Sequence, residues 1–170
     1  MEKANSPLET IIDEIDRALD SGFYYLAVAA TLTLPDICVS LVDGDRRKKR
    51  GERYAKWCDK NLGDNFAYVT GNDLWSLRCG ASHSGRFGGL DHNVGRVIFS
   101  LPGTGVFVNC LFNDAYFYSV SDFCRNFMAD VRKWYAKHAD DENVRKHMER
   151  MVQYRPDGIA PYVEGAPVLA

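Results

Sequence analysis

Apolar residues recur at helical spacing over the first part of the chain. In segment 7–20 they lie three or four positions apart, as on one face of a helix: Leu8, Ile11, Ile12, Ile15 and Leu19. Ser6 and Pro7 are typical of residues that begin a helix, and Gly22 is typical of residues that follow one. The pattern therefore predicts an amphipathic helix over 7–20.

The next segments also have the pattern of helices. A second helix starts near Phe23 and is apolar almost all round, which predicts a central position in a bundle. Pro35 must kink or restart this helix, because its ring removes an amide donor and clashes with the preceding turn. Segment 46–61 predicts a third helix, and Thr70 followed by Asp73 indicates the start of a fourth.

The pattern changes after residue 93. Segments 94–101 and 106–112 are rich in β-branched and aromatic residues, and the turn residues Pro102-Gly103-Thr104-Gly105 lie between them. This arrangement predicts a β-hairpin near 94–112. Ser121 then indicates the start of a long helix, and a shorter helix follows near 140–153.

Together these elements predict an all-α fold, a bundle of five or six helices with one inserted β-hairpin. We expect a single domain over residues 1–155, because single hydrophobic cores usually hold about 100–200 residues. The last residues, 156–170, hold three prolines and predict an extended C-terminal tail.

Composition and cysteine usage narrow the class of protein. The chain has 170 residues, 46% hydrophobic and 26% charged, which excludes a disordered chain and a collagen-like repeat. The longest uncharged apolar stretch, 24–34, is shorter than the roughly 20 residues that span a bilayer. Five cysteines without a C-x-x-C pair indicate reduced thiols. We therefore expect a cytoplasmic protein that does not enter a membrane.

The net charge of −2 conceals a basic segment. Residues 45–60 hold eight lysines and arginines against three acidic residues, so the remainder of the chain is acidic. Such a segment can hold a polyanion such as RNA, or it can simply be a solvated turn. The candidate RNA-binding residues are Arg46, Arg47, Lys48, Lys49, Arg50 and Arg53.

Arg78 and His83 are the candidate catalytic residues. An arginine offers a fixed charge and a planar donor fork that suits phosphate oxygens. A histidine titrates near neutrality, so it can accept a proton from a nucleophile or donate one to a leaving group. The alternative is that Arg78 pairs with Asp73 or bonds helix-end carbonyls, and that His83 caps a helix.

This arginine, four intervening residues and a histidine, late in a set of helices, resembles the motif of the HEPN superfamily (higher eukaryotes and prokaryotes nucleotide-binding). The resemblance covers residues 8–87. Segments 34–38, 53–57 and 77–85 also resemble a set of uncharacterised bacterial proteins. Cys79 follows Arg78 at a position where active HEPN members often carry asparagine.

The resemblance implies a metal-independent endoribonuclease of a defence or toxin–antitoxin type, which acts as a homodimer, needs no cofactor and has an antitoxin or other partner protein. His83 would serve as general acid or base while the RNA 2′-hydroxyl attacks the adjacent phosphate, giving a cyclic phosphate. Arg78 would stabilise the charge on the phosphorane oxygens. The alternative hypothesis is a non-catalytic helical module for protein interaction or nucleotide binding.

Overall fold

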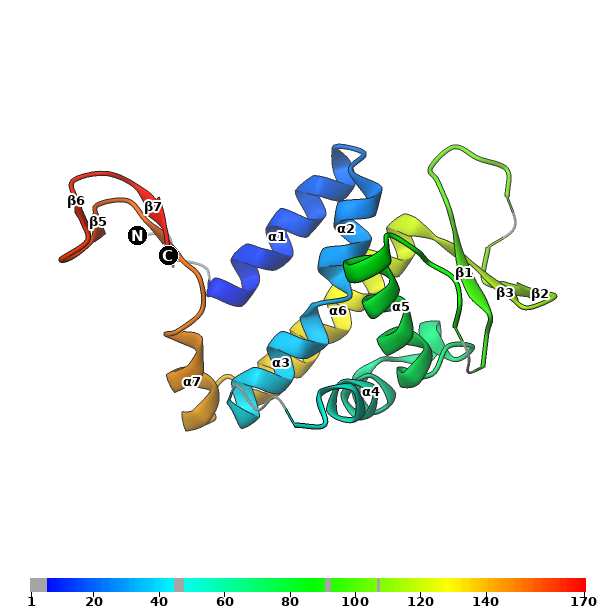
Figure 1. Cartoon of the computed structure of the whole chain (residues 1–170), viewed down its shortest axis with the longest axis horizontal. Coiled ribbons are helices and arrows are strands. Elements are labelled where there is room, and N and C mark those ends of the chain that lie inside the picture. The colour runs from blue at the N-terminus through cyan, green and yellow to red at the C-terminus, as the bar shows by residue number, and fades with distance from the viewer. Residues whose placement is uncertain (1–5, 45–47, 91–92, 107) are drawn as a thin grey trace.

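The computed structural model describes residues 6–44, 48–90, 93–106 and 108–170, and its helices gather around helix α6 (Val120–His138) (Figure 1). Helix α6 contacts α1 (Pro7–Asp20), α2 (Tyr24–Thr31), α3 (Leu34–Asp43) and α4 (Arg50–Asn61). Its buried apolar face, with Phe123, Phe127 and Val131, forms the centre of the core. The remaining helices are α5 (Gly71–Ser84) and α7 (Glu142–Met148), and a 3₁₀ turn, η1, covers Asp64–Phe66.

The predicted helix starts are confirmed where a side chain caps the helix. Ser6 accepts a hydrogen bond from the Glu9 amide at the start of α1. Thr70 and Asp73 form a reciprocal capping box at the start of α5. Each cap satisfies amides that the first helical turn leaves without a partner. Gly71 follows this cap, and a Cβ there would collide with the carbonyl of Ala55, so α5 begins against the backbone of α4.

The apolar stretch from α2 into α3 is broken near Pro35, as predicted. Helix α2 ends at Thr31, and α3 starts at Leu34 with the proline in its first turn, where no amide donor is needed. By length and composition alone, Tyr24–Asp43 is apolar enough to cross a membrane. Half of that stretch is buried inside the protein, as expected of a core helix.

The predicted hairpin is wrong in its strand pairing. Strand β1 (Arg96–Ser100) does not pair with β2 (Cys110–Phe112); both pair with β3 (Ala115–Ser119), in the order β1-β3-β2. Strands β2 and β3 form the hairpin across the two residues Asn113-Asp114, with Asn113 in the left-handed conformation, whereas β1 runs parallel to β3. Asn tolerates that conformation well, so the local turn formed there rather than at 102–105.

The C-terminal segment after α7 forms two short ribbons. Strand β4 (Tyr154–Arg155) pairs with β7 (Val168–Leu169), and β5 (Gly158–Ile159) pairs with β6 (Val163–Glu164). This arm extends beyond α7, away from the other helices (Figure 1).

The all-α expectation is corrected: the structure is 55% helix and 14% strand, a mixed fold in which helices dominate. Local periodicity identified the helices, but the β3 strand and the C-terminal ribbons depend on partners elsewhere in the chain. Helix α6 accordingly begins at Val120 and is capped by Ser119, not by Ser121, because residues 115–119 belong to the sheet.

Candidate functional site

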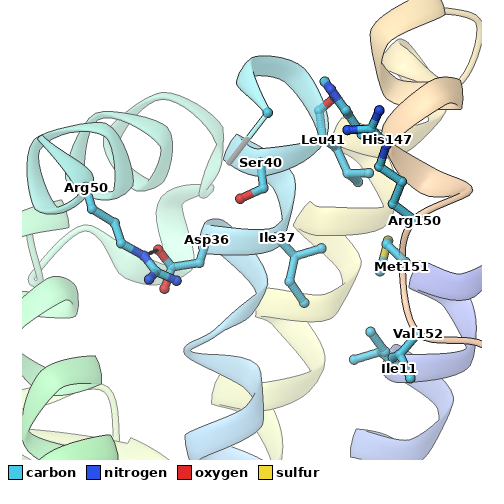
Figure 2. A pocket seen from close by; sticks show the side chains of 11 residues that line it. Ile11, Asp36, Ile37, Ser40, Leu41, Arg50, His147, Arg150, Met151 and Val152 are labelled. Carbon is cyan, nitrogen blue, oxygen red and sulfur yellow. Dashed lines mark hydrogen bonds and ion pairs between the residues drawn. The ribbon is translucent and has the colours of Figure 1, made fainter. Parts of the chain in front are cut away.

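Arg78 belongs to a buried ionic junction rather than to an open site. The Asp36 carboxylate, on the first turn of α3, is 9% exposed and lies between two guanidinium groups. Arg78 Nε donates to its Oδ2 at 3.0 Å, and Arg50 Nε donates to its Oδ1 at 2.9 Å. Figure 2 shows the Arg50 side chain reaching across from α4 to Asp36. We call these three residues the Asp36 junction.

The surroundings of Arg78 hold it in the junction. Its side chain is 14% exposed, and its guanidinium carbon lies 5.4 Å from the centre of the Trp75 ring, in cation–π range. The predicted alternative partner, Asp73, is instead used by the Thr70 cap and by the amides of Asn93 and Val94. The Arg78 charge is therefore balanced by a carboxylate from a different helix.

His83 lies apart from the junction. Helix α5 continues through Ser84, and five residues along an α-helix correspond to about 140° of rotation. The His83 side chain is exposed in the last turn of α5, whereas Arg78 turns inward to α3. Within one chain, the structure does not bring the two side chains to one phosphate-sized site, and their joint catalytic role stays a prediction.

The predicted basic segment divides into groups with different partners. Arg46 and Arg47 lie outside the described residues. Lys48 is exposed, Lys49 lies 3.2 Å from Glu52 on the surface, and Arg50 belongs to the Asp36 junction. Arg53 points along α4 toward the end of α3, where its Nη1 lies 3.5 Å from the Asp43 carboxylate. Among the predicted RNA-binding residues that the structure describes, Arg53 lines a cavity that α4 forms with α3 and α6.

Arg53 lines a partly open cavity of about 620 Å³ between α3, α4 and the last turn of α6. We call it the basic hollow. Its basic residues come from two helices: Arg53, Lys56 and Lys60 from α4, and Lys137 and His138 from α6. Among its described lining residues, Asp43 is the only carboxylate. Four permanent cations therefore face one anion, an excess of positive charge that attracts an anionic ligand.

Three buried donor atoms on two residues of the hollow lack hydrogen-bond partners within the described chain. Trp57 is 7% exposed, and its indole Nε1–H donates to no acceptor. Arg53 Nε and Nη1 also donate no hydrogen bond, although Nη1 lies 3.5 Å from the Asp43 carboxylate in an ion pair. Leaving a buried donor unpaired costs about 1–3 kcal/mol, so such groups are rare unless another molecule completes them.

His138 and Cys38 complete the chemistry of the hollow. The His138 Nδ1 lies 2.7 Å from the Trp134 carbonyl, so this nitrogen carries a proton, and the ring stacks on Trp134 at 4.7 Å between centroids. Burial raises the pKa of the Cys38 thiol well above its ordinary value. Cys38 therefore stays protonated at neutral pH and is not a nucleophile.

A second cavity, of about 400 Å³, lies on the opposite side of α3, between α1, α7 and the chain that follows α7 (Figure 2). Ile37 and Met151 are among its apolar walls. His147 Nδ1 is bonded to the Leu41 carbonyl at 2.8 Å, and Arg50 is bonded to Asp36. This cavity is mainly apolar, in contrast to the basic hollow, where the cations outnumber the carboxylate.

Neither a search for metal ligands nor comparison with known proteins assigns a function to these residues. Over the described ranges, no group of three or more His, Cys, Asp or Glu side chains is placed to hold a metal ion. Comparison with protein-family models, with curated proteins and with solved structures finds no match to this chain.

Several residues of the hollow were missed as site residues. Lys56 and Lys60 follow Arg53 by three and seven positions, which places all three on one face of a helix, so their spacing was a usable signal. Lys137 and His138 come from α6, about eighty residues later, and nothing in the local sequence connects them with α4. Only the tertiary packing of α6 brings them to the same cavity.

Proposed function

We propose that this protein binds RNA through the basic hollow and the adjoining exposed face of α4. The observation that carries the proposal is the group of four permanent cations around one carboxylate, beside buried donors of Arg53 and Trp57 that lack hydrogen-bond partners. Lysine and arginine side chains contact phosphates irrespective of base identity, so the interaction is with the RNA backbone. RNA is the polyanion that the resemblance to HEPN proteins implies.

We propose that the protein binds RNA and that Arg78 and His83 do not cleave it. A guanidinium stabilises a phosphorane only if it can turn toward it, and Arg78 is already bonded to a buried carboxylate. Releasing Arg78 would leave the buried charge of Asp36 with Arg50 alone, which is costly in a poorly hydrated site. The Asp36 junction therefore supports a structural role for Arg78.

The test is fluorescence anisotropy with an unstructured single-stranded RNA at several salt concentrations. The variant Lys56→Gln/Lys60→Gln/Lys137→Gln removes three charges from the hollow. We expect weaker binding and a slope of log affinity against log salt that is shallower by about 2, since each phosphate contact on a single strand contributes about 0.7. A matched control, Arg17→Gln/Arg86→Gln/Lys146→Gln, removes three charges from α1, the loop after α5 and α7.

Equal slopes for the two triple variants would show that binding depends on net charge alone and would overturn the proposal. Cleavage is measured in the same samples by incubating RNA with wild type and with His83→Ala in chelator. Intact RNA in both supports binding without cleavage. Cleavage by wild type that His83→Ala abolishes would instead establish the catalytic hypothesis and overturn the non-catalytic one.

A further inference from the structure

We propose that the basic hollow receives a nucleotide that bears a terminal phosphate, at the end of an RNA chain. The ligand chemistry is a phosphomonoester attached to a nucleoside. This inference rests on the proposed function and specifies which part of the RNA the hollow binds.

The shape of the site favours a chain end over an internal phosphate. An internal phosphodiester is joined to a nucleotide on both sides, so it lies along an open groove or ridge. The hollow is instead a partly open cavity between three helices, and the Arg53 and Trp57 donors without hydrogen-bond partners are buried. A terminal phosphate has only one covalent neighbour, so it can enter with the rest of the chain running outward over α4.

The donors of the hollow suit the charge of a phosphomonoester. Its second ionisation has a pKa near 6, so at pH 7 it carries a charge of about −1.5 to −2 and presents three terminal oxygens. Arg53 and Lys60 of α4 and Lys137 of α6 line the hollow and carry charged donors, and Trp57, another lining residue, carries a buried indole N–H without a partner. A phosphodiester carries one charge and two free oxygens, so it would leave more of these donors unpaired.

Two further features of the lining support this ligand. Arg53 Nη1 lies 3.5 Å from Asp43, outside hydrogen-bond geometry, and the Asp43 side chain is 40% exposed, so water can solvate it when Arg53 turns to a phosphate. On the α3 side, Val39 and Val42 give the hollow an apolar wall. A sugar or base can pack there while its phosphate lies among the cations.

The experiment compares one RNA sequence with three kinds of end: 5′-phosphate, 3′-phosphate and hydroxyl at both ends. We expect at least one phosphorylated form to bind wild type about tenfold more tightly than the hydroxyl form, because charge-assisted hydrogen bonds are the strong ones. The preference should decline below about pH 6, where the monoester loses its second charge. Adenosine monophosphate and inorganic phosphate are tested as competitors.

The variant Trp57→Phe removes the indole donor and keeps an aromatic ring against Trp134. It should lower the ratio of the affinities for phosphorylated and hydroxyl-ended RNA, and its melting temperature verifies folding. Equal affinity of wild type for all three ends would overturn this inference and leave RNA binding intact. Binding of adenosine monophosphate without binding of any hydroxyl-ended RNA would support the hollow as a phosphomonoester site and overturn RNA as its source.

Discussion

The Asp36 junction and the basic hollow both include residues of α3 and α4, but they differ in how positive charge is balanced. In the junction, one buried carboxylate bonds two guanidinium groups. In the hollow, one half-exposed carboxylate faces four permanent cations. A cation that already has a buried partner contributes to the fold, whereas a cation without one is available to a ligand.

This difference changes the roles that we give to the basic residues singled out from the sequence. Arg50 and Arg78 are basic residues in a predicted RNA-binding segment and a predicted catalytic motif, yet both are bonded to Asp36. Lys56 and Lys60 lie in the same basic segment but were not named as RNA-binding residues, and Lys137 lies outside it, yet all three line a cavity. Charge alone did not separate the two groups; the position of the carboxylates did.

Breaking the junction should have the largest effect. Asp36→Asn keeps the shape of the side chain but leaves the Arg78 guanidinium, 14% exposed, without a counter-charge. Removing one partner of a buried ion pair costs about 3–5 kcal/mol, and we expect a loss of this size in the free energy of unfolding. Urea denaturation monitored by circular dichroism measures it.

The control is Asp43→Asn at the hollow, which should cost less than about 1 kcal/mol because the Asp43 side chain is 40% exposed and its contact with Arg53 is not a hydrogen bond. If Asp36→Asn were no more destabilising than Asp43→Asn, the Asp36 junction would not be a stabilising element. RNA affinity of folded Asp36→Asn should equal that of wild type.

Alkaline pH should produce the next largest effect, and it leaves the charges of the Asp36 junction unchanged, because arginine and aspartate do not titrate there. Burial raises the pKa values of the Cys38 and Cys58 thiols well above 9, and raises that of Cys124 from 9.0 to about 11. The folded protein therefore holds these protons more tightly than the unfolded chain. Their contribution is complete below the unfolded pKa and is lost as pH rises through the folded pKa.

For Cys124 alone the loss amounts to about 3 kcal/mol between pH 9 and pH 11, at 1.36 kcal/mol per pKa unit. Denaturation at a series of pH values measures it, and Cys124→Ala should show a shallower decline than wild type. Parallel curves for the two proteins would contradict the assignment of this loss to the thiol.

Removing the carboxylate of the hollow tests how the negative charge of Asp43 affects RNA binding. Asp43→Asn leaves Arg53 without its ion-pair partner and removes a negative charge from the binding surface. We expect RNA affinity at low salt to increase about threefold, corresponding to about 0.6 kcal/mol, and the gain to vanish at high salt because exposed charges are screened. Anisotropy titrations at two salt concentrations measure the change. A lower affinity would show that Asp43 itself contributes to binding.

The sequence predicted the helices well because their information is local. Ser6 and Thr70 cap the helices that they were expected to cap, and Pro35 divides the apolar stretch between α2 and α3. The strands were harder, since the turn residues at 102–105 and the pair Asn113-Asp114 both permit a chain reversal. Which one forms a hairpin depends on the parallel pairing of β1 with β3, which no local pattern encodes.

The site was predictable only in part for a similar reason. The basic segment was visible in the sequence, and Arg53 does line the hollow. The partner of Arg78 is Asp36, forty-two residues earlier on another helix, so the Arg78–Asp73 alternative based on sequence proximity was wrong. An arginine can pair with any carboxylate that the fold brings close, and here the packing of α5 against α4 and α2 places Arg78 beside Asp36 rather than Asp73.

The smallest expected effect distinguishes two lysines of equal charge, Lys49 directly before α4 and Lys60 within it. Lys49 lies 3.2 Å from Glu52, and both side chains are exposed, so Lys49→Gln removes a cation that is already paired. Lys60 lines the hollow and has no acidic partner among the described residues. We expect Lys60→Gln to weaken RNA binding about threefold with a salt slope shallower by about 0.7, and Lys49→Gln to change affinity by less than about 1.5-fold.

Both variants have the same net charge and should unfold at the same urea concentration as wild type within error. If Lys49→Gln weakened binding as much as Lys60→Gln, pairing would not decide which cations contact RNA, and the distinction between the junction and the hollow would lose its functional meaning.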